Sequence, residues 1–230
     1  MAKNNAKLWL LDNIELFDEL SPDQKIVLQN SIVKYKYNKK DVIFQSGDRM
    51  DRVYFVVQGR VKIVKISETQ KEGIKKIIRT GDFYGELAAI DPENYTHFSD
   101  SAIVMKNETV VLAIPTTVFK QVLESQPAVY QKVINKVLSN YKKLNNRLDS
   151  VMLKDSRRRV IDFMKEMAEE VGRPIGYEIL IKHKLTHQEI ASITGISRQK
   201  VTTILNEFKQ QGLIHLERNS ILVHDKKLFE

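Results

Sequence analysis

Five polar side chains recur on one side of a predicted helix near the C-terminus, and all of them can hydrogen-bond to nucleic-acid bases: Arg198, Gln199, Thr202, Thr203 and Asn206. Arginine presents two donors to guanine, and glutamine can both donate to and accept from adenine. Nearby side chains suit phosphate oxygens instead: His187, Ser197, Lys200 and Lys209. The pattern predicts a helix that enters a major groove. The alternative is a solvated face of a helical subdomain.

The segment from Thr186 to Leu213 contains the signals needed to position that helix. Thr186 and Glu189 have the spacing of a capping box, which predicts the start of a first helix. Gly195 predicts a turn, and Ser197 predicts the cap of a second helix. That helix has an apolar stripe at helical spacing: Val201, Ile204, Leu205 and Phe208. Residues 213–216 and 221–223 then predict a β-hairpin wing.

Three segments, in this order, resemble the Crp/Fnr family of bacterial transcription regulators: VYFVVQGRVKI (53–63), GDFYGELAAI (81–90) and residues 185–214. The resemblance covers nearly the whole chain. It implies an α+β protein with three parts: a double-stranded β-helix (jelly roll) sensor like a cyclic-nucleotide-binding domain, a long dimerisation helix, and a winged helix-turn-helix. We place these parts at residues 1–126, including N-terminal helices, at 127–154 and at 155–230. The partners implied are double-stranded DNA with a palindromic site, a second copy of the chain, and RNA polymerase.

Short strands are predicted across the first domain, separated by turn residues: 42–44, 53–57, 61–66, 74–78, 102–105 and 110–114. This spacing is typical of a jelly roll. Residues 8–33 read as helical, with a second helix start at Ser21. A cupin-like metalloenzyme would need several inward His and carboxylate ligands, and this segment has only His97. Because no other catalytic arrangement is present, we expect a protein that is not an enzyme.

The candidate effector pocket is formed by Gly85, Glu86, Leu87 and Ser101. In the family's cyclic-nucleotide binders, the corresponding glycine turn opens a short helix whose backbone N–H groups face the phosphate, and the Glu holds the ribose. An Arg directly before a Ser-Ala pair neutralises the phosphate. Here the pair is Ser101-Ala102, and Asp100 occupies the position of that Arg. A carboxylate would repel the phosphate, so we expect an unknown effector other than cAMP, or no effector.

The segment from Pro127 to Leu153 predicts one long helix with an a/d seam of the coiled-coil type: Tyr130, Ile134, Val137, Tyr141, Leu144, Leu148 and Val151. We expect this seam to pair with a second copy, and the alternative is packing on the β-roll of the same chain. Residues 153–156 are the predicted hinge. The basic run 157–159 suits either DNA phosphates or a solvated turn.

The composition favours an anionic partner, with a formal net charge of +8 and a pI near 9.4. The excess does not lie in the predicted DNA-binding domain, because residues 155–230 contain 13 Lys and Arg against 11 Asp and Glu. The chain has no cysteine, which excludes a cysteine-ligated iron–sulfur cluster and a thiol switch. We expect a cytoplasmic protein with no cofactor, no metal and no association with membranes.

Two regulatory mechanisms fit these features. In the first, a signal at the β-roll changes the crossing of the dimer helices, and with it the separation of the two DNA-reading helices. In the second, a ligand-independent dimer binds DNA, and its activity follows its abundance. The residue types at 199, 202 and 203 predict a half-site different from the well-known ones of the family.

Overall fold

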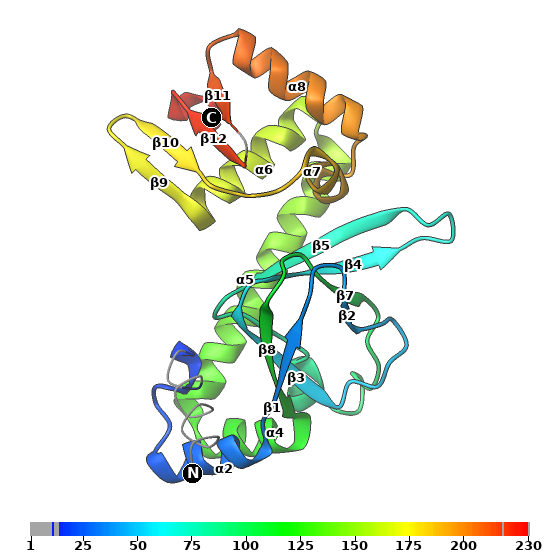
Figure 1. Ribbon diagram of the computed structural model, residues 1–230, viewed down its shortest axis with the longest axis vertical. Coiled ribbons are helices and arrows are strands. Elements are labelled where there is room, and N and C mark those ends of the chain that lie inside the picture. The colour runs from blue at the N-terminus through cyan, green and yellow to red at the C-terminus, as the bar shows by residue number, and fades with distance from the viewer. Residues whose placement is uncertain (1–10, 12–13, 218, 230) are drawn as a thin grey trace. The chain divides into compact units, whose positions relative to one another are not determined.

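The computed structural model describes residue 11, residues 14–217 and residues 219–229 (Figure 1). Its contacts divide the chain into two compact units, residues 1–140 and residues 141–230. The long helix α5 (Pro127–Leu153) contributes to both units.

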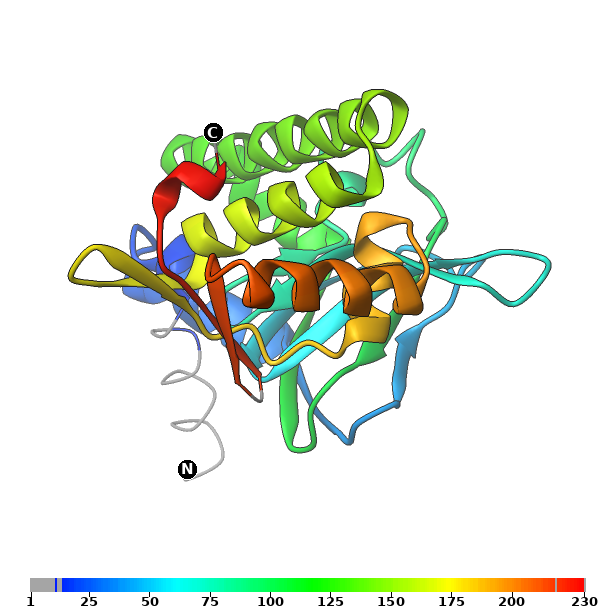
Figure 2. The ribbon, with the colours of Figure 1, turned by 90° about the horizontal axis from the view of Figure 1, so that it is seen from above.

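The first unit contains two four-stranded antiparallel sheets. The six predicted strands are present, and two further strands, at 33–37 and 83–84, were not predicted. One sheet has the order β1-β8-β3-β6, with β1 (Val33–Tyr37), β8 (Thr109–Pro115), β3 (Arg52–Gln58) and β6 (Phe83–Tyr84). The other has the order β2-β7-β4-β5, with β2 (Val42–Phe44), β7 (Ser101–Val104), β4 (Arg60–Ile66) and β5 (Glu72–Arg79). The β4–β5 hairpin extends beyond the rest of the roll (Figures 1 and 2).

Apolar residues of the β1-β8-β3-β6 sheet alternate between two cores, whereas those of the other sheet face the core between the sheets. On β8, Val111 belongs to the core between the sheets, whereas Leu112 and Ile114 belong to a second core on the outer face. Because successive strand residues point to opposite faces, this fully buried strand serves both cores. Helix α4 (Thr116–Ser125) and the start of α5 cover the outer core through side chains such as Phe119 and Val133.

The N-terminal helical prediction is confirmed where the structure describes the chain, but the helices are shorter than expected. A single 3-10 turn η1 (Glu15–Phe17) precedes α2 (Pro22–Ser31). Ser21 and Gln24 form the predicted reciprocal capping box. Strand β1 begins directly after the C-cap of α2. Residues 8–10, 12 and 13 of the predicted helical segment lie outside the described residues.

The second unit is built on α6 (Ser156–Val171), which Asp155 caps by accepting a hydrogen bond from the backbone N–H of Arg158. Helices α7 (His187–Thr194) and α8 (Arg198–Gln210) pack against it. The predicted wing is present as β11 (Ile214–Glu217) and β12 (Ser220–Val223), followed by η2 (Lys226–Phe229).

A second hairpin completes the sheet of this unit and was not predicted. It consists of β9 (Gly172–Ile175) and β10 (Glu178–Ile181), and the sheet order is β11-β12-β10-β9. Gly172 both ends α6 and begins β9, so the sequence contains no separate strand start. Its Cα approaches the backbone oxygen of Ala168 so closely that a Cβ would lie 2.2 Å from that oxygen.

Candidate nucleic-acid interface

Local capping sets the geometry of the α7–turn–α8 segment. Thr186 Oγ1 accepts from the backbone of Glu189, and the Glu189 carboxylate accepts from the backbone of Thr186, which confirms the predicted capping box. Gly195 has a φ of 71°, in the left-handed region that glycine adopts without a steric penalty. Ser197 Oγ then accepts from the backbone N–H of Lys200 and starts α8. The two helices therefore meet at a defined angle, as in a helix-turn-helix.

The two faces of α8 divide as the sequence predicts. The apolar stripe is buried at Val201, Ile204, Leu205 and Phe208. Of the five proposed base-contacting residues, Thr202 is half-buried. The other four are exposed: Arg198, Gln199, Thr203 and Asn206. Among the described residues, the side chains of Arg198, Gln199 and Asn206 have no hydrogen-bond or ion-pair partner. They are available to an external ligand.

The two threonines differ from those three residues because their hydroxyl groups are already bonded. Thr202 Oγ1 donates to the backbone oxygen of Arg198 at 3.0 Å, and it lies 2.8 Å from Nδ1 of His187. Thr203 Oγ1 donates to the backbone oxygen of Gln199 at 3.1 Å. Neither hydroxyl keeps a free proton to donate to a base.

The proposed phosphate-contacting residues lie at the start of α7 and at the two ends of α8. His187 is half-buried at the start of α7, and its ring joins α7 to α8 through Thr202. Ser197 is exposed, but its hydroxyl is the N-cap of α8. Lys200 and Lys209 are exposed in the first and last turns of α8. The structure leaves these two ammonium groups in the positions from which an α8 helix in a groove could reach phosphates.

The basic run at residues 157–159 stabilises the protein's own helices. Arg157 donates to Glu207 at 3.0 Å and to Gln211 at 2.7 Å, and its guanidinium lies 4.4 Å from the ring centroid of Phe208. It therefore joins the start of α6 to the end of α8. Arg159 donates to the backbone oxygens of Val151 and Lys154. It thereby satisfies carbonyl groups left open at the end of α5.

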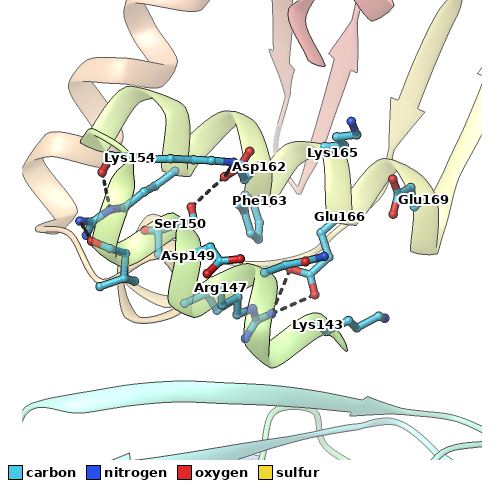
Figure 3. Close-up of a pocket in the computed structure, with 15 residues that line it drawn as sticks. Lys143, Arg147, Asp149, Ser150, Lys154, Asp162, Phe163, Lys165, Glu166 and Glu169 are labelled. Carbon is cyan, nitrogen blue, oxygen red and sulfur yellow. Dashed lines mark hydrogen bonds and ion pairs between the residues drawn. The ribbon is translucent and has the colours of Figure 1, made fainter. Parts of the chain in front are cut away.

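A cavity of about 320 Å³ lies between the C-terminal half of α5, α6 and the end of α7 (Figure 3). Charged side chains bridge the two long helices across it. Arg147 donates to both carboxylate oxygens of Glu166, and Ser150 and Lys154 both donate to Asp162. Lys143 and Glu170 form a further ion pair at 2.5 Å. These bonds hold α6 antiparallel to α5, so we assign the cavity a structural role.

The predicted a/d seam of α5 is mostly exposed in the single chain. Tyr130, Tyr141, Leu144, Leu148 and Val151 have between 42% and 62% of their surface exposed. Ile134 and Val137 are half-buried. The side of α5 that packs on the first unit is a different one and uses Val129 and Val133. Three further exposed apolar residues were not in the predicted seam: Leu138, Met152 and Leu153.

The predicted effector residues surround a glycine that the fold requires. Gly85 has a φ of 98°, and a Cβ there would lie 2.6 Å from the backbone oxygen of Arg52. Glu86 follows it and precedes the four-residue helix α3 (Leu87–Ile90). The Glu86 side chain is buried, and among the described residues its Oε2 atom has no hydrogen-bond partner. Burial raises the pKa of Glu86, while the charges of Lys76 and Lys136 lower it.

Asp100 is also buried and is paired inside the protein. Its Oδ1 atom lies 2.7 Å from Nζ of Lys75, and its Oδ2 atom accepts from Tyr84 and Ser99. Burial and the charges of Asp100 and Glu86 raise the pKa of Tyr84. The hydroxyl of Ser101 accepts a hydrogen bond from the backbone of Ser46. Lys75 and Tyr84 were not among the predicted residues, because nothing in the local sequence ties them to Asp100.

Aromatic side chains fill the space between the two sheets next to these acids. Phe98 has only 2% of its surface exposed, and its ring is stacked on Phe44 with a centroid distance of 3.7 Å. Tyr54 and Tyr84 pack around the same pair. Phe98 comes from the loop at 91–99, whose backbone bonds to residues 47–50. That loop therefore places a phenylalanine in the interior of the roll.

Each of the two units contains a segment that matches the model of a known protein family. Residues 34–126 match the family model of the cyclic nucleotide-binding domain, and residues 158–230 match that of the Crp-like helix-turn-helix domain. The chain is 24% identical over 218 residues to the CRP-like cAMP-activated global transcriptional regulator of Mycobacterium tuberculosis, covering 95% of this chain and 96% of that protein. The chain belongs to the Crp/Fnr family of transcription regulators.

Other Crp/Fnr-type proteins show the same likeness along most of the chain. The Global nitrogen regulator of Nostoc sp. is 24% identical, over 82% of this chain and 83% of that protein. The structure of a CooA variant from Carboxydothermus hydrogenoformans has a TM-score of 0.79 at 23% identity, covering 94% of this chain and 93% of that one. The jelly roll, long helix and winged helix-turn-helix that the resemblance implied are thus confirmed as the fold.

Two further observations describe this Crp/Fnr family member. Among the described residues, no helix has the length and apolar character needed to cross a bilayer. Within the same part of the chain, no group of three or more His, Asp or Glu side chains is placed to hold a metal ion.

Proposed function

We propose that two copies of this chain form a dimer along α5 and bind an inverted-repeat DNA operator through α8. The observation that carries the proposal is the exposed polar face of α8, on which Arg198, Gln199 and Asn206 have no partner within the described chain. A helix-turn-helix dimer places its two recognition helices in successive major grooves about 34 Å apart. The operator should therefore have half-sites one helical turn apart.

The dimer is supported by the unburied seam of α5. Leu144 and Leu148 have 51% and 57% of their surface exposed, and such apolar rows at heptad spacing are stable in water when a second helix covers them. Sedimentation of the purified protein tests this part. Wild type should sediment as a dimer and Leu148→Asp as a monomer, because the new charge would lie in the seam. Lys142→Asp, on an exposed position off the seam, is the control and should remain dimeric.

The effector part of the proposal is that the sensor does not bind cAMP. Asp100 is held by Lys75, so the position beside Ser101 presents a paired carboxylate where a phosphate would need a cation. Calorimetry with purified protein should detect no binding of cAMP at micromolar concentrations. Micromolar binding would overturn this part of the proposal and leave the DNA-binding part intact.

A second candidate mechanism, ligand-independent regulation by abundance, is favoured by the filled interior of the roll. Phe44 and Phe98 stack directly on each other in the space between the sheets. The two mechanisms differ in one measurable quantity, the operator affinity of purified protein with and without a small-molecule extract of cells. An increase or decrease in affinity supports an effector, and an unchanged affinity supports control by abundance. Contacts with RNA polymerase remain part of the proposal, as an expectation from the family.

A further inference from the structure

We infer that Thr202 and Thr203 read thymine through their methyl groups rather than reading bases through their hydroxyl groups. The inference rests on the proposed entry of α8 into a major groove. From residue type alone, Thr202 and Thr203 were expected to make polar contacts with bases; the inference assigns them apolar contacts instead.

The proton of the Thr202 hydroxyl is used inside the protein. It donates its proton to the backbone oxygen of Arg198, four residues earlier in the helix. Since a hydroxyl has one proton, the contact with His187 at 2.8 Å requires Nδ1 of that ring to be the donor. His187 thus acts as a positioning residue that holds the side chain of Thr202 in one rotamer.

The hydroxyl of Thr203 is bonded in the same way, to the backbone oxygen of Gln199. Thr203 is exposed and Thr202 is half-buried, and both lie on the polar face of α8 that also contains Gln199 and Asn206. With each oxygen turned toward the helix backbone, the methyl group is the part of each side chain left to meet a ligand. Helical threonines commonly make this bond to the preceding turn.

Base edges in the major groove offer one feature that such a methyl group can read. Guanine N7 and O6, adenine N7 and thymine O4 are acceptors, and neither threonine has a proton left to donate to them. Adenine N6 and cytosine N4 are donors, but each threonine oxygen is turned toward the helix backbone rather than toward the groove. The C5-methyl group of thymine is the apolar feature of the groove, and a threonine methyl is a recognised partner for it. The arrangement therefore predicts a thymine-containing half-site at the bases beneath the centre of α8.

Replacing thymine with uracil in the operator tests the inference, because uracil keeps every hydrogen-bonding group and lacks only the methyl. An operator is first obtained by selecting bound sequences from random DNA with the full-length protein. Each thymine is then replaced singly and symmetrically by deoxyuridine. We expect one or two positions at which uracil weakens binding about fourfold per half-site, the effect of exposing one methyl group.

Variants of Thr203 separate the two groups of its side chain. Thr203→Val keeps a methyl and loses the hydroxyl, so it should retain the preference for thymine over uracil. Thr203→Ser keeps the hydroxyl and loses the methyl. At one of the positions where uracil weakens wild-type binding, this variant should bind the thymine and the uracil operators equally. Thr202→Ser is the matched variant at the neighbouring position and preserves the bond to His187. Circular dichroism would verify that each variant keeps its helices.

The possible failures are distinguishable. Absence of any selected sequence would overturn the proposed function and, with it, this inference. Specific binding with no sensitivity to uracil would overturn the inference alone. A Thr203→Ser protein that still prefers thymine, or a Thr203→Val protein that loses operator binding, would assign the reading of that base to the hydroxyl or to another residue, and would also overturn it.

Discussion

The ammonium group of Lys75 on β5 lies 2.7 Å from Oδ1 of Asp100, a carboxylate with 5% of its side chain exposed. In the sequence, Asp100 directly precedes Ser101-Ala102, the position at which the resembled cyclic-nucleotide binders have an Arg. Its charge is balanced within the protein, and no anionic ligand is needed to complete it. This relationship makes the pair part of the folded roll.

Lys75→Ala should lower the free energy of unfolding by about 2 kcal/mol, because it leaves a buried carboxylate without its cation. We expect less than for a fully buried pair, since 45% of the Lys75 side chain is exposed and screened by solvent. Urea denaturation provides the measurement. Lys36→Ala, which removes an exposed lysine of β1, is the control and should change stability by less than about 0.5 kcal/mol. Equal effects of the two substitutions would contradict this role for Lys75.

Glu86→Gln should become more stabilising, relative to wild type, as the pH rises. Burial raises the pKa of Glu86 above its ordinary value of 4.5, so the unfolded chain releases this proton at a lower pH than the folded chain. The free energy of unfolding of wild type therefore falls between those two pKa values, and the Gln variant lacks that fall. Urea denaturation of both proteins from pH 4 upward measures the difference. A difference that does not depend on pH would contradict a raised pKa of Glu86.

Arg157→Met should destabilise the protein by about 1 kcal/mol without changing the salt dependence of DNA binding. Its guanidinium joins α6 to α8 through Glu207, Gln211 and the ring of Phe208, and these contacts are partly exposed. A phosphate-contacting residue would behave differently, since its loss reduces the slope of affinity against salt. A shallower slope for Arg157→Met would show that this residue contacts DNA.

Gln199→Ala and Lys200→Ala should have opposite signatures on operator variants. Loss of Gln199 should cost about 1–3 kcal/mol at one symmetric base position and leave other positions unchanged. Loss of Lys200 should weaken binding to all sequences alike and reduce the salt slope by about 0.9 for each phosphate contact removed. Competition binding against a set of singly substituted operators measures both. A uniform loss for Gln199→Ala would remove it from the residues that read bases.

Local signals in the sequence were sufficient to predict the helices and the turn of the α7–α8 segment. The capping pairs at Ser21 and Thr186 and the caps of α6 and α8 involve residues three apart, so spacing alone predicts them. Apolar residues between turn signals likewise predict six of the eight strands of the roll and both strands of the wing. The hairpin β9–β10 was missed because α6 passes into it at Gly172 with no intervening turn.

The ion pair between Lys75 and Asp100 could not be predicted from local spacing. The sequence singles out Asp100 as a departure from the family pattern, but its partner Lys75 lies 25 residues earlier, on a strand two positions away from β7 in the sheet. The bond between His187 and Thr202 and the contact of Arg157 with Phe208 also join different helices. Such pairs depend on tertiary packing, which residue spacing along the chain does not specify.

The most direct test of the central claim is the dependence of affinity on half-site spacing in the selected operator. If α5 pairs two copies so that both α8 helices face one side of the duplex, insertion of five base pairs between the half-sites turns one half-site to the opposite side. Mobility-shift titrations with wild type should then show binding reduced to that of a single half-site. Equal affinity for the original and the lengthened operator would contradict the dimeric reading of DNA.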